Sequence, residues 1–190
     1  GRGEGVAVTG DGVNDAPALR RADMGVAMGA GGTDVARQAA GMVLTDDNFA
    51  SIVAAVEEGR TIYDNILKFV RFQLSTNIGA IASVAAAPLA GLPLPFNPVQ
   101  ILWVNIIMDG PPAMALGVDP ARPGVMEEPP RKPGRPILTP WRLLKLGGYG
   151  ATMAVGTLGL LAWGLAALPH AQALTLAFTT FVLFQVFNAF

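Results

Sequence analysis

The sequence contains no cysteine, which excludes disulfide bonds and thiolate metal sites within its 190 residues. It is also poor in charge, because 14% of its residues are Asp, Glu, Lys or Arg, whereas soluble domains are nearer about a quarter. The net charge of −1 argues against nucleic acid as a partner. No basic segment followed by an apolar core opens the chain, so no signal peptide is expected. The missing initiator Met predicts a piece of a longer protein.

Apolar residues make up 52% of the sequence and gather in long runs. Charged residues lie mostly before residue 72 and between residues 119 and 145. A run of about 20 apolar residues is enough to cross the hydrocarbon of a bilayer. We therefore predict an all-α membrane domain over residues 72–190, with spans at 72–92, 97–116, 143–168 and 173–190.

Before the first span, short apolar runs alternate with helical patterns. The runs at 6–8, 25–28 and 42–44 read as buried strands, and 16–22 and 33–40 read as helices, the second capped by Thr33 or Asp34. This alternation predicts a parallel α/β sheet over residues 1–48, as the tail end of a larger domain. A charged helix capped by Asp47 or Asn48 follows over 49–71 and is expected to be a stalk entering the membrane.

Basic residues predict the orientation of the spans. The stalk and the polar loop at 117–142 hold Lys and Arg, the loop through Arg122, Arg131, Lys132 and Arg135. The turns at 91–98 and 168–172 hold neither. Because positive charge stays on the cytoplasmic side, residues 1–71 and 117–142 are expected in the cytosol.

Residues 9–17 read Thr-Gly-Asp-Gly-Val-Asn-Asp-Ala-Pro and directly follow the first predicted strand. Ligands of open α/β sheets bind at that edge, and Gly10 and Gly12 allow a tight turn there. The carboxylates of Asp11 and Asp15, with the amide of Asn14, suit Mg2+ beside a phosphate. The alternative is a plain surface turn rich in Asp, Asn and Gly.

Asp109 is the only acidic residue in the four predicted spans. A carboxylate in the membrane costs on the order of 3 kcal/mol and usually marks an ion pathway. Asn105 lies one helical turn earlier, and Gly110-Pro111-Pro112 predicts an interrupted helix with free carbonyls. Asn77 in the preceding span can supply an amide oxygen to the ion or can be a structural residue, and the sequence favours neither interpretation. The alternative for Asp109 is a structural acid bonded to a neighbouring helix.

The segment TGDGVNDAPAL resembles the hinge motif of the P-type ATPases, ion pumps that pass through a phosphorylated aspartate. The resemblance continues in order through residues 22–29, 42–49 and 56–60, and so covers essentially the whole chain. It implies that residues 1–48 are the C-terminal part of a HAD-like Rossmannoid phosphorylation domain. Residues 102–112 resemble the sixth span of the calcium-pump branch, most like the secretory-pathway calcium/manganese pumps and their bacterial relatives.

The resemblance also implies roles for residues of the motif. Asp11 would ligate Mg2+, Asn14 would bond a phosphoryl oxygen, and Asp15 would hold the loop and the ion. Thr9 and Gly10, with Asn14, would line the phosphate of ATP. The nucleophile of the DKTGT segment, the nucleotide and actuator domains and the first four spans are implied as the rest of the polypeptide. Without them, these residues alone are expected neither to hydrolyse ATP nor to form a phosphoenzyme.

The same resemblance implies one transported divalent ion per cycle. Three positions depart from the two-site calcium pumps. Ala80 and Gln185 stand where those pumps carry Glu, and Met108 stands where they carry Thr. Asn105 and Asp109 would keep the other site, completed by a Glu and backbone carbonyls of a fourth span. Met114 stands where secretory-pathway pumps carry Gln, so Ca2+ is favoured over Mn2+.

Three other interpretations remain. The pumped ion can be Na+ or H+, the chain can be a soluble phosphatase of the same superfamily, or it can be a truncated membrane fragment without activity. Richness in Ala, Gly and Arg, with compact loops, predicts a bacterial cell membrane as the location.

Overall fold

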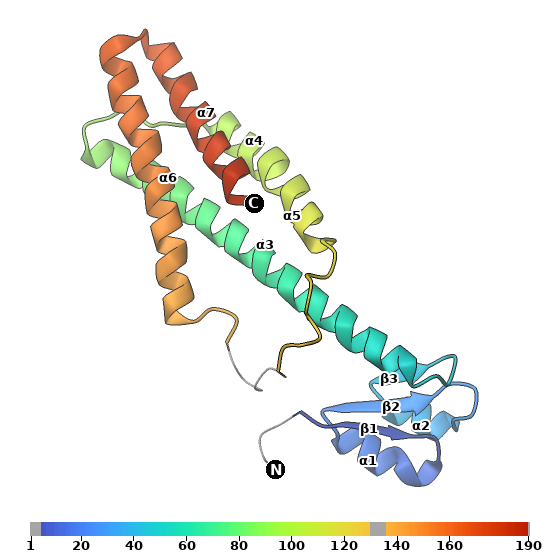
Figure 1. The fold of residues 1–190 in the computed structure, drawn as a ribbon. Coiled ribbons are helices and arrows are strands. Elements are labelled where there is room, and N and C mark those ends of the chain that lie inside the picture. Colours follow the sequence, from blue (N-terminus) through green and yellow to red (C-terminus); the bar gives the residue numbers. More distant parts are fainter. Residues whose placement is uncertain (1–4, 130–135, 190) are drawn as a thin grey trace. The chain divides into compact units, whose positions relative to one another are not determined.

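A computed structural model describes residues 5–129 and 136–189, and Figure 1 labels its helices and strands. The chain divides into two compact units, of which the first holds residues 1–61 and 121–136 and the second holds residues 62–120 and 137–190. Three basic residues of the predicted loop, Arg131, Lys132 and Arg135, lie outside the described residues.

The first unit is built around a parallel sheet of three strands in the order β1-β2-β3. The elements are β1 (Ala7–Gly10), η1 (Val13–Asp15), α1 (Ala16–Arg21), β2 (Met24–Met28), α2 (Asp34–Ala39) and β3 (Met42–Leu44). The predicted parallel α/β pattern is confirmed. Strand β1 runs on through Thr9 and Gly10, beyond the predicted end, because these residues pair with Val26 and Ala27 of β2.

Helices α1 and α2 contact each other on one side of this sheet (Figure 1). Two right-handed crossovers in the same direction place their helices on the same face. Leu19, Ala27 and Ala36 form the buried core between the helices and the sheet. Gly25 permits the close approach of α1, since a Cβ at this position would lie 2.3 Å from the carbonyl oxygen of Leu19.

Helix α3 (Ala50–Leu89) is a continuous helix of 40 residues that contains the predicted stalk and most of the first predicted span. Asn48 caps it, because its Oδ1 accepts a 3.0 Å hydrogen bond from the backbone N–H of Ala50. The apolar part of α3 is not among the described helices that are long and apolar enough to cross a membrane. Polar side chains such as Gln73 and Asn77 lower its hydropathy, so three spans rather than four meet that criterion.

The three candidate spans are Pro98–Gly117, Pro140–Ala167 and His170–Ala189. The first consists of α4 (Pro98–Trp103), the π-helical turn η2 (Val104–Met108) and α5 (Gly110–Gly117), and the others are α6 (Pro140–Ala167) and α7 (His170–Ala189). Helix α6 begins three residues before the predicted span, because Thr139 caps it and Pro140 is favoured in a first turn.

Helices α6 and α7 pack against each other as a helical hairpin (Figure 1). Small residues permit the close contacts: a Cβ on Gly150 would lie 2.5 Å from Ile78 Cγ2 of α3, and one on Gly164 would lie 3.2 Å from Ala173 Cβ of α7. Membrane helices commonly meet through such residues. One core cluster of this unit consists of Phe96, Val104, Met153 and Phe181, and a second consists of Leu161, Ala173 and Ala177.

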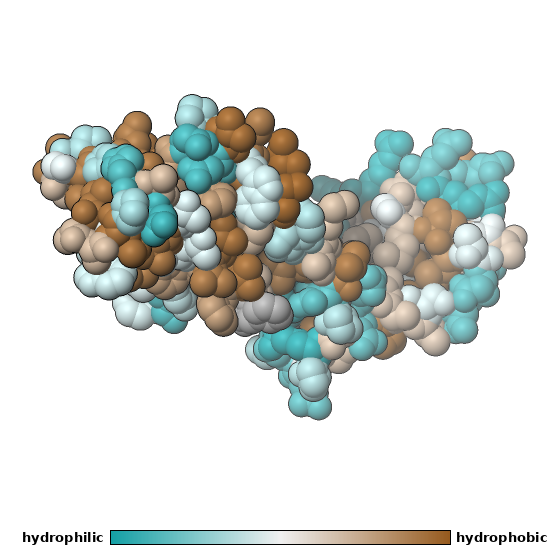
Figure 2. Space-filling view, turned by 90° about the horizontal axis from the view of Figure 1, so that it is seen from above, coloured by the Kyte–Doolittle hydropathy of each residue, from teal (hydrophilic) through white to brown (hydrophobic). Residues whose placement is uncertain are grey.

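The outer surface of the second unit is strongly apolar. Figure 2 shows hydrophobic side chains crowded over the helices, whereas the sheet unit carries mostly hydrophilic ones. Val155, Trp163 and Phe187 are 71%, 58% and 73% exposed. Apolar patches of this kind mark a membrane or another partner, and the span lengths point to lipid.

Candidate functional site

The loop after β1 brings Asp11 and Asp15 to the carboxyl edge of the sheet. Asp15 turns back toward the strand, and its Oδ2 accepts hydrogen bonds from the backbone N–H groups of Asp11 at 3.1 Å and Gly12 at 2.9 Å. This geometry makes Asp15 the brace of the loop. Gly10 has no room for a side chain, since its Cβ would lie 2.5 Å from Asp15 Cβ.

Asp11 is held by its backbone and leaves its carboxylate exposed. Thr33 donates to the Asp11 carbonyl oxygen from its backbone N–H at 2.8 Å and from Oγ1 at 3.2 Å. No described residue donates a hydrogen bond to the Asp11 carboxylate, and the Asn14 side chain is likewise exposed. The loop therefore presents one carboxylate and one amide to solvent at a fixed position.

The carboxylate and amide oxygens of this loop are suitable ligands for a Mg2+ ion that also binds a phosphate. No group of three or more His, Cys, Asp or Glu side chains that could hold a metal occurs within residues 5–129 and 136–189. Mg2+ is usually held by one or two carboxylates, with waters and substrate phosphates completing its octahedron. Asp11 and the remaining oxygen of Asp15 supply this kind of incomplete set.

A second loop at the same edge, after β2, is organised by Asp47. Asp47 Oδ1 accepts from the N–H groups of Gly29 at 2.6 Å and Ala30 at 3.1 Å, and Oδ2 accepts from Gly31 at 2.6 Å. These hydrogen bonds, that of Gly31 above all, hold the pKa of Asp47 below its ordinary value. The sequence pattern left Asp47 or Asn48 as the cap of α3; Asn48 has that role, and Asp47 holds the loop.

Asp109 lies at the junction of η2 and α5 in the second unit and is 6% exposed. Its Oδ2 accepts a 3.1 Å hydrogen bond from Gln73 Nε2 of α3. Its Oδ1 is buried without a hydrogen-bond partner among the described residues. Buried polar atoms of this kind call for a ligand such as water or an ion.

The helix around Asp109 is interrupted just before the prolines. The backbone N–H of Asp109 donates to the Val104 carbonyl at 3.0 Å, a bond five residues back that closes the π-helical turn. Such single turns occur frequently at functional sites. Pro111 and Pro112 lie in the first turn of α5, where a missing N–H leaves no bond unmade.

The structure does not join the three predicted membrane ligands directly. Asp109 is buried, Asn77 is half-buried and Asn105 is exposed. No described hydrogen bond links either amide to Asp109. The π-helical turn explains the different environments of Asn105 and Asp109, because it departs from the spacing on which their shared face was predicted.

The sequence pattern did not predict the contact of Gln73 with Asp109. Gln73 lies four residues before Asn77 on α3, and therefore on the same helical face. A polar amide one turn before Asn77, in an otherwise apolar stretch, was the available indication. Gln73 is neutral and donates to one carboxylate oxygen, so it orients Asp109 without pairing it with an opposite charge.

The positions that depart from the two-site pattern lie in apolar or enclosed surroundings. Ala80 and Met108 pack against the core cluster of the second unit. Gln185 is fully buried, and neither its amide nitrogen nor its oxygen has a hydrogen-bond partner among the described residues. Met114 is 73% exposed on α5.

The comparisons with known proteins agree with this picture. Residues 93–190 match the family described as "Cation transporting ATPase, C-terminus". The chain is 50% identical over 189 residues to Calcium-transporting ATPase 1 of Yarrowia lipolytica, covering 99% of this chain and 20% of that protein. It is 50% identical over 188 residues to Calcium-transporting ATPase type 2C member 1 of Homo sapiens, covering 98% of this chain and 20% of that protein.

A plant relative, Calcium-transporting ATPase 4, endoplasmic reticulum-type, of Arabidopsis thaliana, is 52% identical over 157 residues, covering 83% of this chain and 15% of that protein. The chain thus spans about a fifth of the length of most of these relatives. All three sources are eukaryotes, so the predicted bacterial location has no support. The candidate spans and these relatives make the chain part of a multi-pass membrane protein. It belongs to the cation-transporting P-type ATPases, whose C-terminal region it matches.

Proposed function

We propose that the chain is the C-terminal part of an ATP-driven pump that carries Ca2+ across a membrane through an aspartyl-phosphate intermediate. The observation that carries the proposal is the Asp109 carboxylate, which is buried beside an interrupted membrane helix with one oxygen unpartnered. The relatives described above are named calcium-transporting ATPases, which supports Ca2+ as the ion.

In this proposal the Asp109 Oδ1 atom coordinates the transported cation. Gln73 positions the carboxylate through its hydrogen bond to Oδ2. Asn105 and Asn77 contribute amide oxygens when the remaining spans enclose the site. Ca2+ takes six to eight oxygen ligands, so these groups form only part of its coordination shell. A Glu and backbone carbonyls of an upstream span would supply others.

The surroundings of Ala80 and Met108 support the proposal of one ion per cycle. Both side chains pack into the apolar core cluster and offer no oxygen to a second cation. Met114 is exposed and carries no amide oxygen, so it cannot make the Mn2+-selective contact that the resemblance assigns to the Gln of secretory-pathway pumps. Counting Ca2+ bound per phosphoenzyme tests this stoichiometry.

The sheet unit is proposed as the tail of a HAD-like phosphorylation domain in the cytosol. Asp11 and Asp15 would hold Mg2+, which neutralises charge on the transferred phosphoryl group. Asn14, Thr9 and Gly10 would face the phosphate at the loop. Asp15 keeps the loop closed by accepting the N–H groups of Asp11 and Gly12.

The test uses the full-length pump with Asp109→Asn, which keeps the shape of the side chain and removes its charge. Phosphorylation from ATP is measured against Ca2+, Mn2+, Na+ and pH. We expect Ca2+-dependent phosphorylation to disappear in Asp109→Asn and to persist in the matched variant Asp34→Asn, whose side chain is 83% exposed. Unchanged Ca2+ dependence in Asp109→Asn contradicts the site, and dependence on Na+ or pH alone contradicts the ion.

A further inference from the structure

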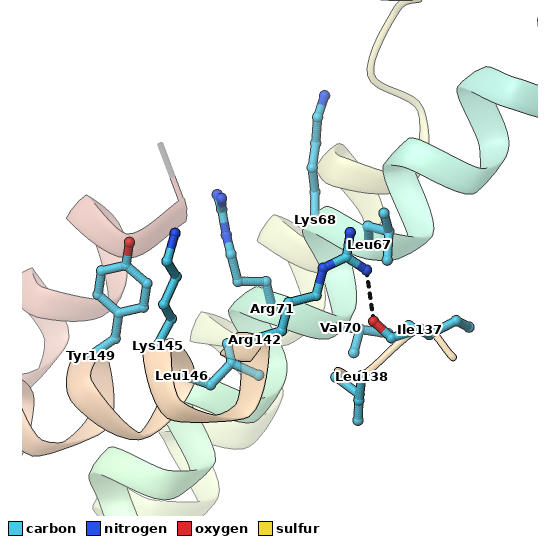
Figure 3. A pocket seen from close by; sticks show the side chains of 10 residues that line it. All are labelled: Leu67, Lys68, Val70, Arg71, Ile137, Leu138, Arg142, Lys145, Leu146 and Tyr149. Carbon is cyan, nitrogen blue, oxygen red and sulfur yellow. Dashed lines mark hydrogen bonds between the residues drawn. The ribbon is translucent and has the colours of Figure 1, made fainter. Parts of the chain in front are cut away.

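A basic pocket of about 310 Å³ lies between α3 and the start of α6 (Figure 3), and neither Asp109 nor Gln73 is among its lining residues. Four of its lining residues are cations: Lys68, Arg71, Arg142 and Lys145. None of the lining residues is an Asp or a Glu. A concave surface with charge of one sign concentrates ions of the other sign.

Only one of these four cations has a carboxylate partner among the described residues. Lys68 pairs with Asp119 at 2.7 Å, so its charge is largely balanced. Arg142 donates one hydrogen bond, from Nη1 to the Ile137 carbonyl at 2.7 Å, and a guanidinium has five N–H donors. Arg71 and Lys145 have no carboxylate partner among the described residues. Three cations therefore remain to receive an anion.

The length of α6 places the pocket at the membrane surface. Its 28 residues extend about 42 Å at about 1.5 Å per residue, whereas the hydrocarbon core is about 30 Å thick. The surplus lies at the N-terminal end, because Arg142 and Lys145 are the only charged residues of α6. Trp141 and Tyr149 occur beside them, as aromatic residues do at the headgroup level.

The pocket is two-sided, as an amphipathic ligand requires. In Figure 3 the tips of Arg71, Lys145 and Tyr149 point to one side, and the apolar side chains of Leu138 and Leu146 lie on the other. An inorganic anion needs only the polar side. A ligand with both a phosphate and an acyl chain uses both sides.

We propose that this pocket binds the phosphate headgroup of an anionic phospholipid from the cytoplasmic leaflet. Arg71, Arg142 and Lys145 hold the phosphate, the Tyr149 hydroxyl donates to it, and the first part of an acyl chain lies against Leu138 and Leu146. Basic pockets between membrane helices on this side of a membrane recognise such headgroups. The proposal does not depend on which ion the pump carries.

The test measures lipid retention on the full-length protein in nanodiscs of phosphatidylcholine with 10% phosphatidylinositol, by native mass spectrometry. Each lost cation should weaken retention of the anionic lipid about fivefold, so Arg142→Gln/Lys145→Gln should weaken it more than tenfold. The matched variant Arg20→Gln/Arg21→Gln, with the same charge change on α1, should retain the lipid like the parent protein. The proposal is overturned if both double variants retain the anionic lipid like the parent protein. It is also overturned if both lose the lipid to the same extent.

Two further measurements keep the test independent of misfolding. Arg142→Lys/Lys145→Arg preserves both charges and should restore retention, so its failure to do so counts against an electrostatic site. In the unmodified protein, a photoreactive phosphatidylinositol should crosslink to residues 137–149 several-fold more than a photoreactive phosphatidylcholine. Equal crosslinking, or complete displacement by millimolar inorganic phosphate, shows that no lipid site of this kind exists.

Discussion

Gln73 on α3 and Asp109 between η2 and α5 are 36 positions apart, yet Gln73 Nε2 donates a 3.1 Å hydrogen bond to Asp109 Oδ2. The bond fixes one carboxylate oxygen of Asp109 and leaves Oδ1 free of protein partners among the described residues. A carboxylate held through one oxygen keeps the direction of its other oxygen when the cation leaves. Such supporting partners usually change affinity by about 10- to 100-fold when removed.

We therefore expect Gln73→Ala in the full-length pump to lower the apparent affinity for Ca2+ by about tenfold, since Asp109 loses its positioning bond. Maximal phosphorylation should change little, because the carboxylate itself remains. The measurement is phosphoenzyme formation against free Ca2+. Gln172→Ala, an exposed position on α7, is the matched control; equal affinity in both variants means that Gln73 does not support the site.

The close approach of Gly10 and Asp15 predicts opposite effects for two Gly→Ala changes. At Gly10 the added Cβ would lie 2.5 Å from Asp15 Cβ, so the loop must shift at a cost of about 1–3 kcal/mol. At Gly59, within α3, nothing lies within 4 Å of the added Cβ, and the helix should gain about 0.5–1 kcal/mol.

Thermal unfolding and Mg2+-dependent phosphorylation of the two full-length variants check this contrast. Gly10→Ala should unfold at lower temperature and need more Mg2+, because Asp11 is displaced along with Asp15. If Gly10→Ala has the same unfolding temperature and Mg2+ dependence as Gly59→Ala, the hydrogen bonds from the loop to Asp15 are not needed for function.

The three hydrogen bonds to Asp47 predict a pH-dependent contribution to stability. The folded pKa lies below the ordinary value of 3.8, chiefly through the N–H of Gly31. The contribution is therefore fully present above pH 3.8 and is lost as the pH falls through the folded pKa. Asp47→Asn should destabilise the sheet unit at neutral pH, and the difference from the parent protein should shrink in acid.

Hydrogen exchange of the Gly29, Ala30 and Gly31 amides measures the Asp47 effect locally. These amides should exchange faster in Asp47→Asn at neutral pH, while Glu58→Gln, at an exposed position of α3, leaves them unchanged. Equal protection in the Asp47 variant shows that the loop holds its shape without the carboxylate.

Two neighbouring residues of α3 should differ in their weight for stability. Asn65 is 4% exposed and donates a 2.8 Å hydrogen bond to the Asp119 carbonyl, so Asn65→Ala should cost about 1–3 kcal/mol. Lys68 pairs with the Asp119 carboxylate, but both side chains are over a third exposed, and Lys68→Ala should cost below about 1 kcal/mol. Chemical unfolding in detergent ranks the two; the reverse order contradicts the burial argument.

Local patterns were sufficient for much of the fold. The alternation of apolar runs with helical patterns predicted the parallel sheet, and β3 has the predicted bounds of residues 42–44. Of the two predicted caps, Thr33 and Asp34, Thr33 has this role: its Oγ1 accepts from the Ala36 N–H, because capping depends on residues three apart. Charge-poor runs predicted three spans that meet the membrane criterion. The first is formed by α4, η2 and α5, the second by α6 and the third by α7. For the sites, residue type alone singled out Asp11, Asp15 and Asp109.

The tertiary structure decided what those residues touch. Asp109 was visible as an acid in an apolar run, but its bond to Gln73 depends on α3 lying beside η2, which no local pattern records. In the same way Asp47 looked like a helix cap, and only the folded loop turned it to Gly29–Gly31. Hydropathy and capping act within a few residues of the chain, whereas a hydrogen bond across 36 positions exists only after packing has brought two helices together.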